Sequence, residues 1–166
     1  MKKGAVLALL LILVTSICSA QDTIDEGTVE ISANFIGSTF GVSTIPAISY
    51  FLTSNIELSG AFHYERGTLD VEGYDADYDA HGLSLLGLYN FYPENLERLI
   101  PFVEVGINVA SLEIEDYDVV DSTGFLIGGG VRYLVKDNFS VNGIFNYQTG
   151  DLEYTRLGVG LSVFIF

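Results

Sequence analysis

The chain has 166 residues, of which 49% are hydrophobic and 17% charged, and its 22 acidic residues outnumber 7 Lys and Arg to give a net charge of −15. This composition is too apolar and too rich in Phe and Tyr for a disordered chain. Its acidity excludes the basic face that nucleic-acid binding needs, so no nucleic-acid partner is expected. No apolar run is long enough for a membrane-spanning helix, which leaves a large buried core or a barrel whose outer face contacts lipid.

Residues 1–20 have the features of a secretory signal peptide. Two lysines and a short apolar run are followed by Cys18-Ser19-Ala20, whose small residues mark a cleavage site before Gln21. The apolar run is too short to anchor the chain by spanning a membrane. We expect residues 21–27 to form a short periplasmic segment. The mature chain then contains no cysteine, which excludes disulfides, thiol catalysis and cysteine-bound metal.

The remaining sequence alternates apolar and polar residues with a period of two, which is the pattern of β-strands. Ten residues at about 3.3 Å each, tilted by about 45°, cover roughly the 25 Å apolar band of an outer membrane. Pro46 lacks an N–H group and is expected to create a local edge or bulge. The pattern predicts eight strands, at residues 28–37, 42–52, 56–64, 81–92, 102–110, 125–135, 139–147 and 156–165.

The connections between these segments alternate in length. On one side the sequence predicts tight turns at 53–55 and 136–138, and a longer connection at 92–100 with room for a helical turn. On the other side it predicts long loops at 65–79 and 111–122 and short ones at 37–41 and 148–153. Short periplasmic turns and long outer loops are typical of outer-membrane barrels.

One face of the predicted strands is almost free of charge, whereas the other carries charged residues, amides and glycines. We expect the apolar face to contact lipid and the polar face to fill the lumen of a barrel. The alternative is a soluble sandwich with the apolar face as its core, but the signal peptide, the loop lengths and the strand count favour the barrel. The predicted fold is therefore all-β, an eight-stranded antiparallel up-and-down transmembrane β-barrel over residues 28–166. Its predicted lumen charge network comprises Glu30, Glu57, His63, Glu104, Arg132 and Arg156.

The chain resembles the small eight-stranded outer-membrane barrels of the OmpA transmembrane-domain and OmpX type. The resemblance rests on residues 49–58, on Tyr89-Asn90-Phe91 with Ile100-Pro101-Phe102-Val103, and on residues 158–166. It implies an outer-membrane location, contact with membrane lipid and lipopolysaccharide, a monomeric state, and recognition by the barrel-assembly machinery through Phe164 and Phe166. Phe166 departs from the family pattern because it lies one residue out of step with the lipid-facing positions.

Two functions are compatible with a polar lumen. An eight-stranded barrel is only just wide enough for its own side chains, so the interior charges are expected to form a plug of paired polar groups. The predicted role is then structural or directed to the cell surface, without enzymatic activity and without a cofactor. The alternative is a small-solute channel, opened by rearrangement of Arg132 or Arg156.

The two long loops are strongly acidic. Hard cations bind carboxylate oxygens, and we name as possible Ca²⁺ or Mg²⁺ ligands Asp75, Asp77, Asp79, Glu113, Glu115, Asp116 and Asp118. The segment from Asp75 is not an EF-hand, because Ala80 and Leu86 replace the required Gly and Glu. The simpler interpretation is a solvated surface, and Tyr74 and Tyr78 suggest a partner surface.

A third function class is an enzyme at the outer rim of the barrel. The two histidines, His63 and His81, flank the first long loop, with Asp79 and Ser84 nearby in the sequence. Enzymes of this kind need a His with a nucleophile or a carboxylate near the outer rim. Histidines near a loop are more commonly structural, so we rank this function last.

Overall fold

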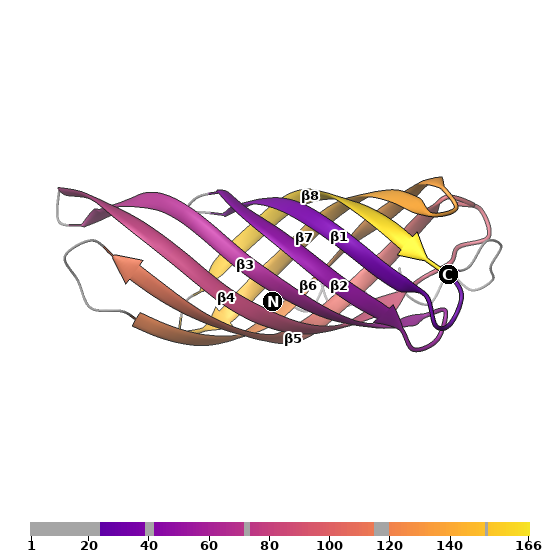
Figure 1. Ribbon diagram of the computed structural model, residues 1–166, viewed down its shortest axis with the longest axis horizontal. Coiled ribbons are helices and arrows are strands. Elements are labelled where there is room, and N and C mark those ends of the chain that lie inside the picture. Colours follow the sequence, from indigo (N-terminus) through magenta and orange to yellow (C-terminus); the bar gives the residue numbers. More distant parts are fainter. Residues whose placement is uncertain (1–23, 39–41, 72–73, 115–119, 152) are drawn as a thin grey trace, which may run out of the picture.

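Eight antiparallel strands close into one barrel in a computed structural model of the chain, which describes residues 24–38, 42–71, 74–114, 120–151 and 153–166 (Figure 1). Each strand pairs with its neighbours in sequence, and the first pairs with the last, from Val29↔Ile165 to Ser38↔Arg156. The strands are β1 (Val29–Ser38), β2 (Val42–Phe51), β3 (Ile56–Val71), β4 (Tyr74–Asn90), β5 (Leu99–Ile114), β6 (Val120–Lys136), β7 (Phe139–Gly150) and β8 (Tyr154–Ile165). The closed barrel confirms the predicted fold and excludes the sandwich.

The described residues include no helix that is long and apolar enough to cross a membrane. The predicted signal peptide lies outside the described residues.

The predicted long loops are largely strand. β3 and β4 stay paired from Glu65↔Ala80 to Val71↔Tyr74, and β5 and β6 stay paired as far as Leu112↔Val120. The prediction was wrong because acidic residues in these segments do not prevent pairing where one or both faces of a ribbon meet water. As a result β3, β4, β5 and β6 extend beyond the other four strands, at the left of Figure 1. We call this the hairpin end, and the opposite end, with the short turns and the C-terminus, the turn end.

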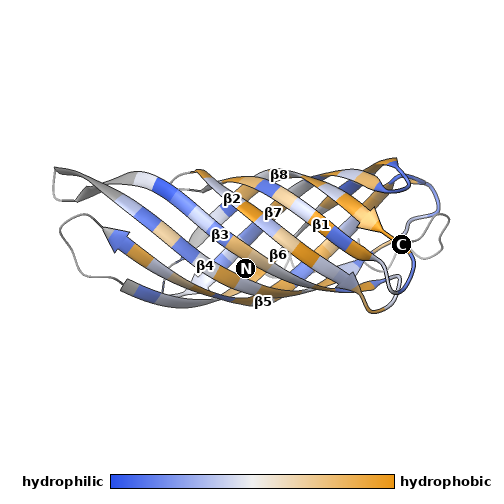
Figure 2. Cartoon of the chain, in the orientation of Figure 1, coloured by the Kyte–Doolittle hydropathy of each residue, from blue (hydrophilic) through white to orange (hydrophobic). Residues whose placement is uncertain are grey.

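Side chains alternate between the outside and the lumen along every strand. The outer face of the barrel is apolar although it is exposed, and Val105 has 57% of its surface accessible. Orange hydrophobic positions alternate with blue hydrophilic ones along the strands in Figure 2. Exposed tyrosines lie near the turn end at Tyr50, Tyr89 and Tyr133 and nearer the hairpin end at Tyr64 and Tyr147. An apolar band between aromatic residues is the arrangement of a membrane-spanning barrel.

Two local expectations are corrected. The alternation of residues 81–92 would place Phe91 on the outer face with Tyr89. It is only 8% exposed because β4 ends at Asn90, and its ring packs edge-on against Tyr89 with centroids 4.9 Å apart. The 92–100 connection contains no helical turn. It consists of turns in which Leu96 N–H donates to the Pro93 carbonyl at 3.0 Å and Leu99 N–H to the Leu96 carbonyl at 2.9 Å.

Pro46 interrupts pairing on one side of β2 only. The ladder to β3 pairs Thr44 with Tyr64 and resumes at Ala47 with Ala61, so Ile45 and Pro46 are skipped without a register shift. The ladder to β1 includes Pro46, opposite Ala33. The expected local disturbance is therefore a gap in one ladder and not a bulge, and β2 is not an edge strand.

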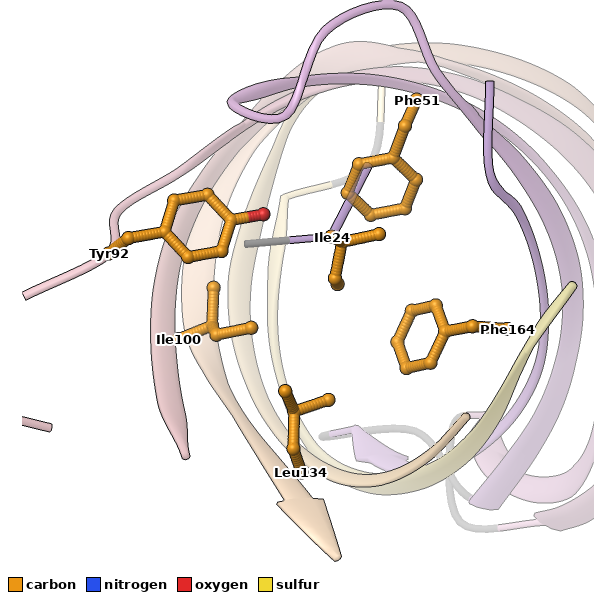
Figure 3. Close-up of a cluster of buried hydrophobic side chains, with 6 residues drawn as sticks. All are labelled: Ile24, Phe51, Tyr92, Ile100, Leu134 and Phe164. Carbon is orange, nitrogen blue, oxygen red and sulfur yellow. The ribbon is translucent and has the colours of Figure 1, made fainter. Parts of the chain in front are cut away.

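The turn end is closed by apolar side chains. Ile24, which precedes the barrel, is 2% exposed and lies in the mouth of the barrel (Figure 3). Gly27, with a φ of +88°, turns the chain toward β1, and its N–H donates to the Phe51 carbonyl at 2.9 Å. The described part of the predicted periplasmic segment is thus packed against the barrel. The cluster that fills the mouth consists of Ile24, Phe51, Tyr92, Ile100, Leu134 and Phe164.

Candidate functional site in the barrel lumen

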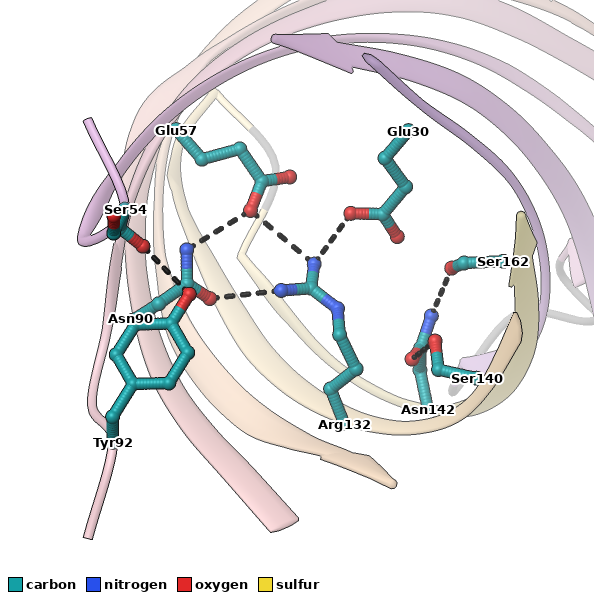
Figure 4. A network of polar contacts seen from close by, with 9 residues as sticks. All are labelled: Glu30, Ser54, Glu57, Asn90, Tyr92, Arg132, Ser140, Asn142 and Ser162. Atoms are coloured by element: carbon teal, nitrogen blue, oxygen red, sulfur yellow. Dashed lines mark hydrogen bonds and ion pairs between the residues drawn. The ribbon is translucent and has the colours of Figure 1, made fainter. Parts of the chain in front are cut away.

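Arg132, on β6, contacts side chains from three other strands, β1, β3 and β4, just inside the apolar mouth (Figure 4). From β6, its Nη2 lies 2.7 Å from Glu30 Oε2 on β1 and 3.2 Å from Glu57 Oε2 on β3. Its Nη1 donates to Asn90 Oδ1 at 2.9 Å, and Asn90 Nδ2 donates to Glu57 Oε2 at 3.1 Å. All four residues are buried. One guanidinium thus holds two carboxylates and an amide away from water, where each partner needs the others.

Three aromatic rings surround the same guanidinium. Arg132 Cζ lies 5.7, 5.4 and 5.6 Å from the ring centroids of Phe51, Phe102 and Phe164, respectively. Each distance is within the range of a cation–π contact. Phe51 and Phe164 also belong to the apolar cluster of the mouth. The charged layer and the apolar layer are therefore continuous, and together they fill the turn end of the lumen.

A second network lies nearer the hairpin end. It is a series of hydrogen bonds in which each side chain donates to the next. The guanidinium of Arg156 has only donors, so its Nη1 donates to His63 Nδ1 at 3.3 Å. His63 must then carry its single proton on Nε2, which donates to Ser84 Oγ. Ser84 Oγ donates to Asn108 Oδ1 at 2.9 Å, and Asn108 Nδ2 donates to Gln148 Oε1 at 3.0 Å. This order of donors keeps His63 neutral.

The structure does not bring His63, His81, Ser84 and Asp79 together in the arrangement that a rim enzyme would need. His63 accepts from Arg156 and donates to Ser84, so it has no free nitrogen to remove the Ser84 proton. His81 is exposed and pairs with Tyr64, one residue beyond His63, so the two histidines lie on opposite faces of the barrel wall. Asp79 is bonded outside the lumen to the Tyr64 hydroxyl, at 3.1 Å.

Glu104 occupies a third position in the lumen, separate from the Arg132 cluster. It is 5% exposed, and its Oε1 accepts from Asn146 Nδ2 at 3.0 Å. Gly128 lies between them in the register, and a side chain there would overlap the Asn146 Cβ. The missing side chain lets the amide reach the carboxylate. A cavity of about 60 Å³ borders these residues and also Asn34 and Arg156.

All six members of the predicted charge network face the lumen, in three groups: Arg132 with Glu30 and Glu57, Arg156 with His63, and Glu104 apart from both. The sequence prediction omitted the neutral partners of these groups. The sequence pattern could have indicated these partners, because residues with an amide or hydroxyl group recur at the inward positions of the strands. The omitted residues include Ser84, Asn90, Asn108, Asn146 and Gln148.

In the described part of the hairpin end, one acidic residue, Asp79, forms an ion pair. Asp79 lies 3.8 Å from Arg66 and faces Glu113 in the adjacent strand. Within the described ranges no three His, Asp or Glu side chains form a group that could hold a metal. The cation prediction stays untested for Glu115, Asp116 and Asp118, which lie outside those ranges, and nothing is assigned to the side chains of Asp75 and Asp77. Tyr78 is not on the surface: it is 3% exposed, and its hydroxyl donates to Glu65 at 2.8 Å.

The two residues predicted as an assembly signal lie in different environments. Phe164 points into the lumen and is 3% exposed, whereas Phe166 follows the end of β8 and is 68% exposed. Their recognition by the assembly machinery stays a prediction.

Comparison with known proteins identifies the type of barrel. The profile of the OprF membrane domain matches residues 19–165. The N-terminal β-barrel domain of Pseudomonas aeruginosa OprF is 23% identical, with a TM-score of 0.68 over 86% of this chain and 100% of that domain. Neisserial surface protein A is 13% identical, with a TM-score of 0.65 over 88% of this chain and 99% of that one. No curated protein sequence matches the chain.

A third similar structure contains a ligand. Ail, the attachment invasion locus protein of Yersinia pestis, is 14% identical, with a TM-score of 0.63 over 84% of this chain and 99% of that one. That structure of Ail is a complex with the heparin analogue sucrose octasulfate.

Proposed function

Because this chain belongs to the OprF membrane domain family and is an outer-membrane β-barrel, we propose that its role is structural and directed to the cell surface, with a lumen that does not conduct solutes at rest. In this proposal the turn end faces the periplasm and the hairpin end faces outward, as is usual for barrels of this kind. The outer belt contacts membrane lipid and lipopolysaccharide, and the single closed sheet needs no second copy of the chain.

The observation that carries this proposal is the filled turn end of the lumen. Glu30, Glu57 and Arg132 are each at most 2% exposed, and Phe51 and Phe164 pack on the guanidinium. Opening a path would separate an ion pair in a poorly solvated environment and expose the apolar mouth, which is costly. A lumen filled in this way leaves the outer surface as the part available to partners.

The projecting ends of β3 to β6 supply that outer surface. Between the apolar row of Leu83 and Val109 and the tip of the hairpin end, the outward positions carry Asp79, Glu113 and Asp121. Arg66 is the one Lys or Arg among the outward residues that the structure describes there, and it is paired with Asp79. An acidic surface attracts basic partners and repels anionic ones. We therefore propose a cationic partner, unlike the polyanion in the structure of Ail.

The second candidate is a small-solute channel, favoured by the cavity of about 60 Å³ and by the polar lining of the lumen. In this alternative the Arg132 cluster is a gate that opens. Conductance separates the two candidates. An enzymatic role has less support, because the hydrogen-bond chain through His63 leaves Ser84 without a base.

The surface role is tested by the binding of a lysine-rich peptide to cells that export the full chain. A triple variant, Asp79→Asn with Glu113→Gln and Asp121→Asn, should bind several-fold less peptide than the wild type. The matched control neutralises three exposed carboxylates at the turn end, Glu94→Gln with Glu97→Gln and Asp137→Asn, and should bind as the wild type does. Equal binding by the wild type and the first variant would contradict the proposal.

A further inference from the structure

A groove of about 580 Å³ lies on the outer wall of the barrel, over β1 to β5. Gly60 is at its centre, in a row of outward residues that the register aligns across the five strands: Ile31, Ile48, Gly60, Leu85 and Ile107. The next row toward the hairpin end lines the rest of the groove with Pro46, Phe62, Leu83 and Val109. None of the described residues that line the groove is charged, so it is a hollow in the apolar outer belt.

The packing of the barrel does not require a glycine at position 60. A Cβ there would meet no atom within 4 Å, so a larger residue would fit and would fill the groove. Glycine in the middle of a strand weakens the strand, and it often marks a place where another molecule approaches closely. Pro46 borders the same groove, where the ladder between β2 and β3 is interrupted. The sequence thus keeps a hollow that a single ordinary side chain would remove.

The position of the groove identifies a lipid chain as its occupant. Gly60 lies midway along β3 between Ile56, which is opposite Tyr89 near the turn end, and Tyr64 nearer the hairpin end. From this middle level the groove extends toward the hairpin end, which faces the outer leaflet in the orientation proposed above. A second copy of the chain would gain little from contact here, because lipid removes the hydrophobic driving force between proteins. A single flexible hydrocarbon chain can follow the hollow and gain its dispersion contacts.

Basic side chains follow the groove at its outer end. Beyond Phe62 and Leu83, the outward positions of β3 and β4 carry Tyr64, Arg66 and His81, and Tyr64 pairs directly with His81. Arg66 and His81 are the basic residues among the outward residues described at the hairpin end. Arg66 lies 3.8 Å from Asp79, but it is exposed, and its five N–H groups leave donors for a second acceptor. Arginine binds phosphate oxygens well, so this rim suits the phosphate of an anionic lipid.

We propose that the groove binds one acyl chain of a lipopolysaccharide molecule, with a phosphate of the same molecule at Arg66 and His81. The outer leaflet supplies the chain, and the basic rim selects a lipid that carries phosphate at this level of the membrane. The inference rests on the orientation proposed above, with the hairpin end outward. It does not rest on a cationic partner, so a negative result with the lysine-rich peptide would leave it unchanged.

The first test is native mass spectrometry of barrels extracted in mild detergent from a host that makes a short lipopolysaccharide of uniform mass. The wild type should retain one lipopolysaccharide molecule, and Gly60→Leu should retain it at least several-fold less often. The matched control is Gly87→Leu, because Gly87 also faces outward, has equal room for a side chain and lies outside the groove. It should behave as the wild type does. No retained lipid in the wild type, or equal retention in Gly60→Leu, would overturn the proposal.

A second variant and a second readout keep the test decisive if Gly60→Leu does not fold. Arg66→Gln with His81→Gln leaves the groove intact and should also lower lipopolysaccharide retention several-fold. In intact cells, photoreactive p-benzoylphenylalanine in place of Phe62 should form lipopolysaccharide adducts several-fold more often than in place of Phe125. Phe125 faces outward opposite Ile107 and lies outside the groove. Equal retention by the double variant, equal adduct yields at the two positions, or adducts at position 62 with phospholipid or a second copy of the chain would overturn the proposal.

Discussion

Arg132 Nη2 and Glu30 Oε2 lie 2.7 Å apart in the lumen, although the two residues are separated by 102 positions in the sequence. They meet because β1 pairs with β8 and so brings the first strand within reach of the sixth. The contact therefore depends on closure of the barrel, and it also closes the turn end of the lumen.

Replacing Arg132 by Met should destabilise the barrel by about 3–5 kcal/mol, because Glu30 and Glu57 would stay buried without a positive charge. Urea unfolding in lipid vesicles, followed by the loss of the gel-mobility difference between boiled and unboiled samples, measures the change. The control Arg66→Met removes an exposed pair at 3.8 Å and should cost no more than about 1 kcal/mol. Equal losses in the two variants would contradict the assigned role of Arg132.

An arginine at position 105 tests the lipid-facing assignment. Val105 lies near the middle of β5 and points outward with 57% exposure, so Val105→Arg should destabilise the barrel by about 2–4 kcal/mol. Glu113→Arg, on the same face beyond the apolar row, is the control and should be tolerated. Full tolerance of arginine at both positions would show that residue 105 does not meet lipid.

The interior glycines should be far less replaceable than an outward one. A Cβ at Gly128 would overlap the Asn146 Cβ and the Phe145 carbonyl oxygen, whereas a Cβ at Gly60 meets no atom within 4 Å. Gly128→Ala should therefore cost about 1–3 kcal/mol through strain and displacement of Asn146, and Gly60→Ala should be nearly neutral. The urea midpoints of the two variants decide the point, and a reversed order would refute the lumen packing described here.

The barrel should lose stability in alkali partly through Tyr92, which lies in the turn after β4. Burial raises the pKa of the Tyr92 hydroxyl to about 12, above its ordinary value of 10. The folded state therefore holds this proton more tightly than the unfolded chain does. The resulting stabilisation is present below pH 10 and is lost as the pH rises to about 12. Tyr92→Phe should flatten the decline of the urea midpoint between pH 10 and 12, and an unchanged slope would contradict this assignment.

Much of the architecture could be predicted from the sequence because the two faces of a membrane barrel differ so strongly in polarity. The alternation around Val105 assigns that strand to the barrel wall and Glu104 to the lumen without knowledge of its partners. The ends of the strands are less predictable, because the acidic segments at the hairpin end can pair as strands or remain loops with the same composition. That is why residues 65–71 and 74–79 were expected to be loop and are strand.

The sequence predicts which residues face the lumen, but it does not predict which of them contact one another there. The alternation of the sequence places Glu104 and Arg156 on the inward face equally well. Only the register and the tilt of the strands determine that Arg156 meets His63. Ile24 was missed for another reason, since a single apolar residue before the first strand has no periodic pattern that would indicate its place in the mouth.

The most direct test of the closed lumen is single-channel recording in planar lipid bilayers. Refolded wild-type protein, shown to be inserted by its heat-modifiable mobility, should give no stepwise conductance above the lipid baseline. A variant that keeps the barrel wall but empties the turn end, Arg132→Ser with Phe51→Ala, should give measurable steps and so prove that the assay detects an open lumen. Regular steps from the wild type, of the same size as those of the variant, would contradict the closed lumen and establish the channel.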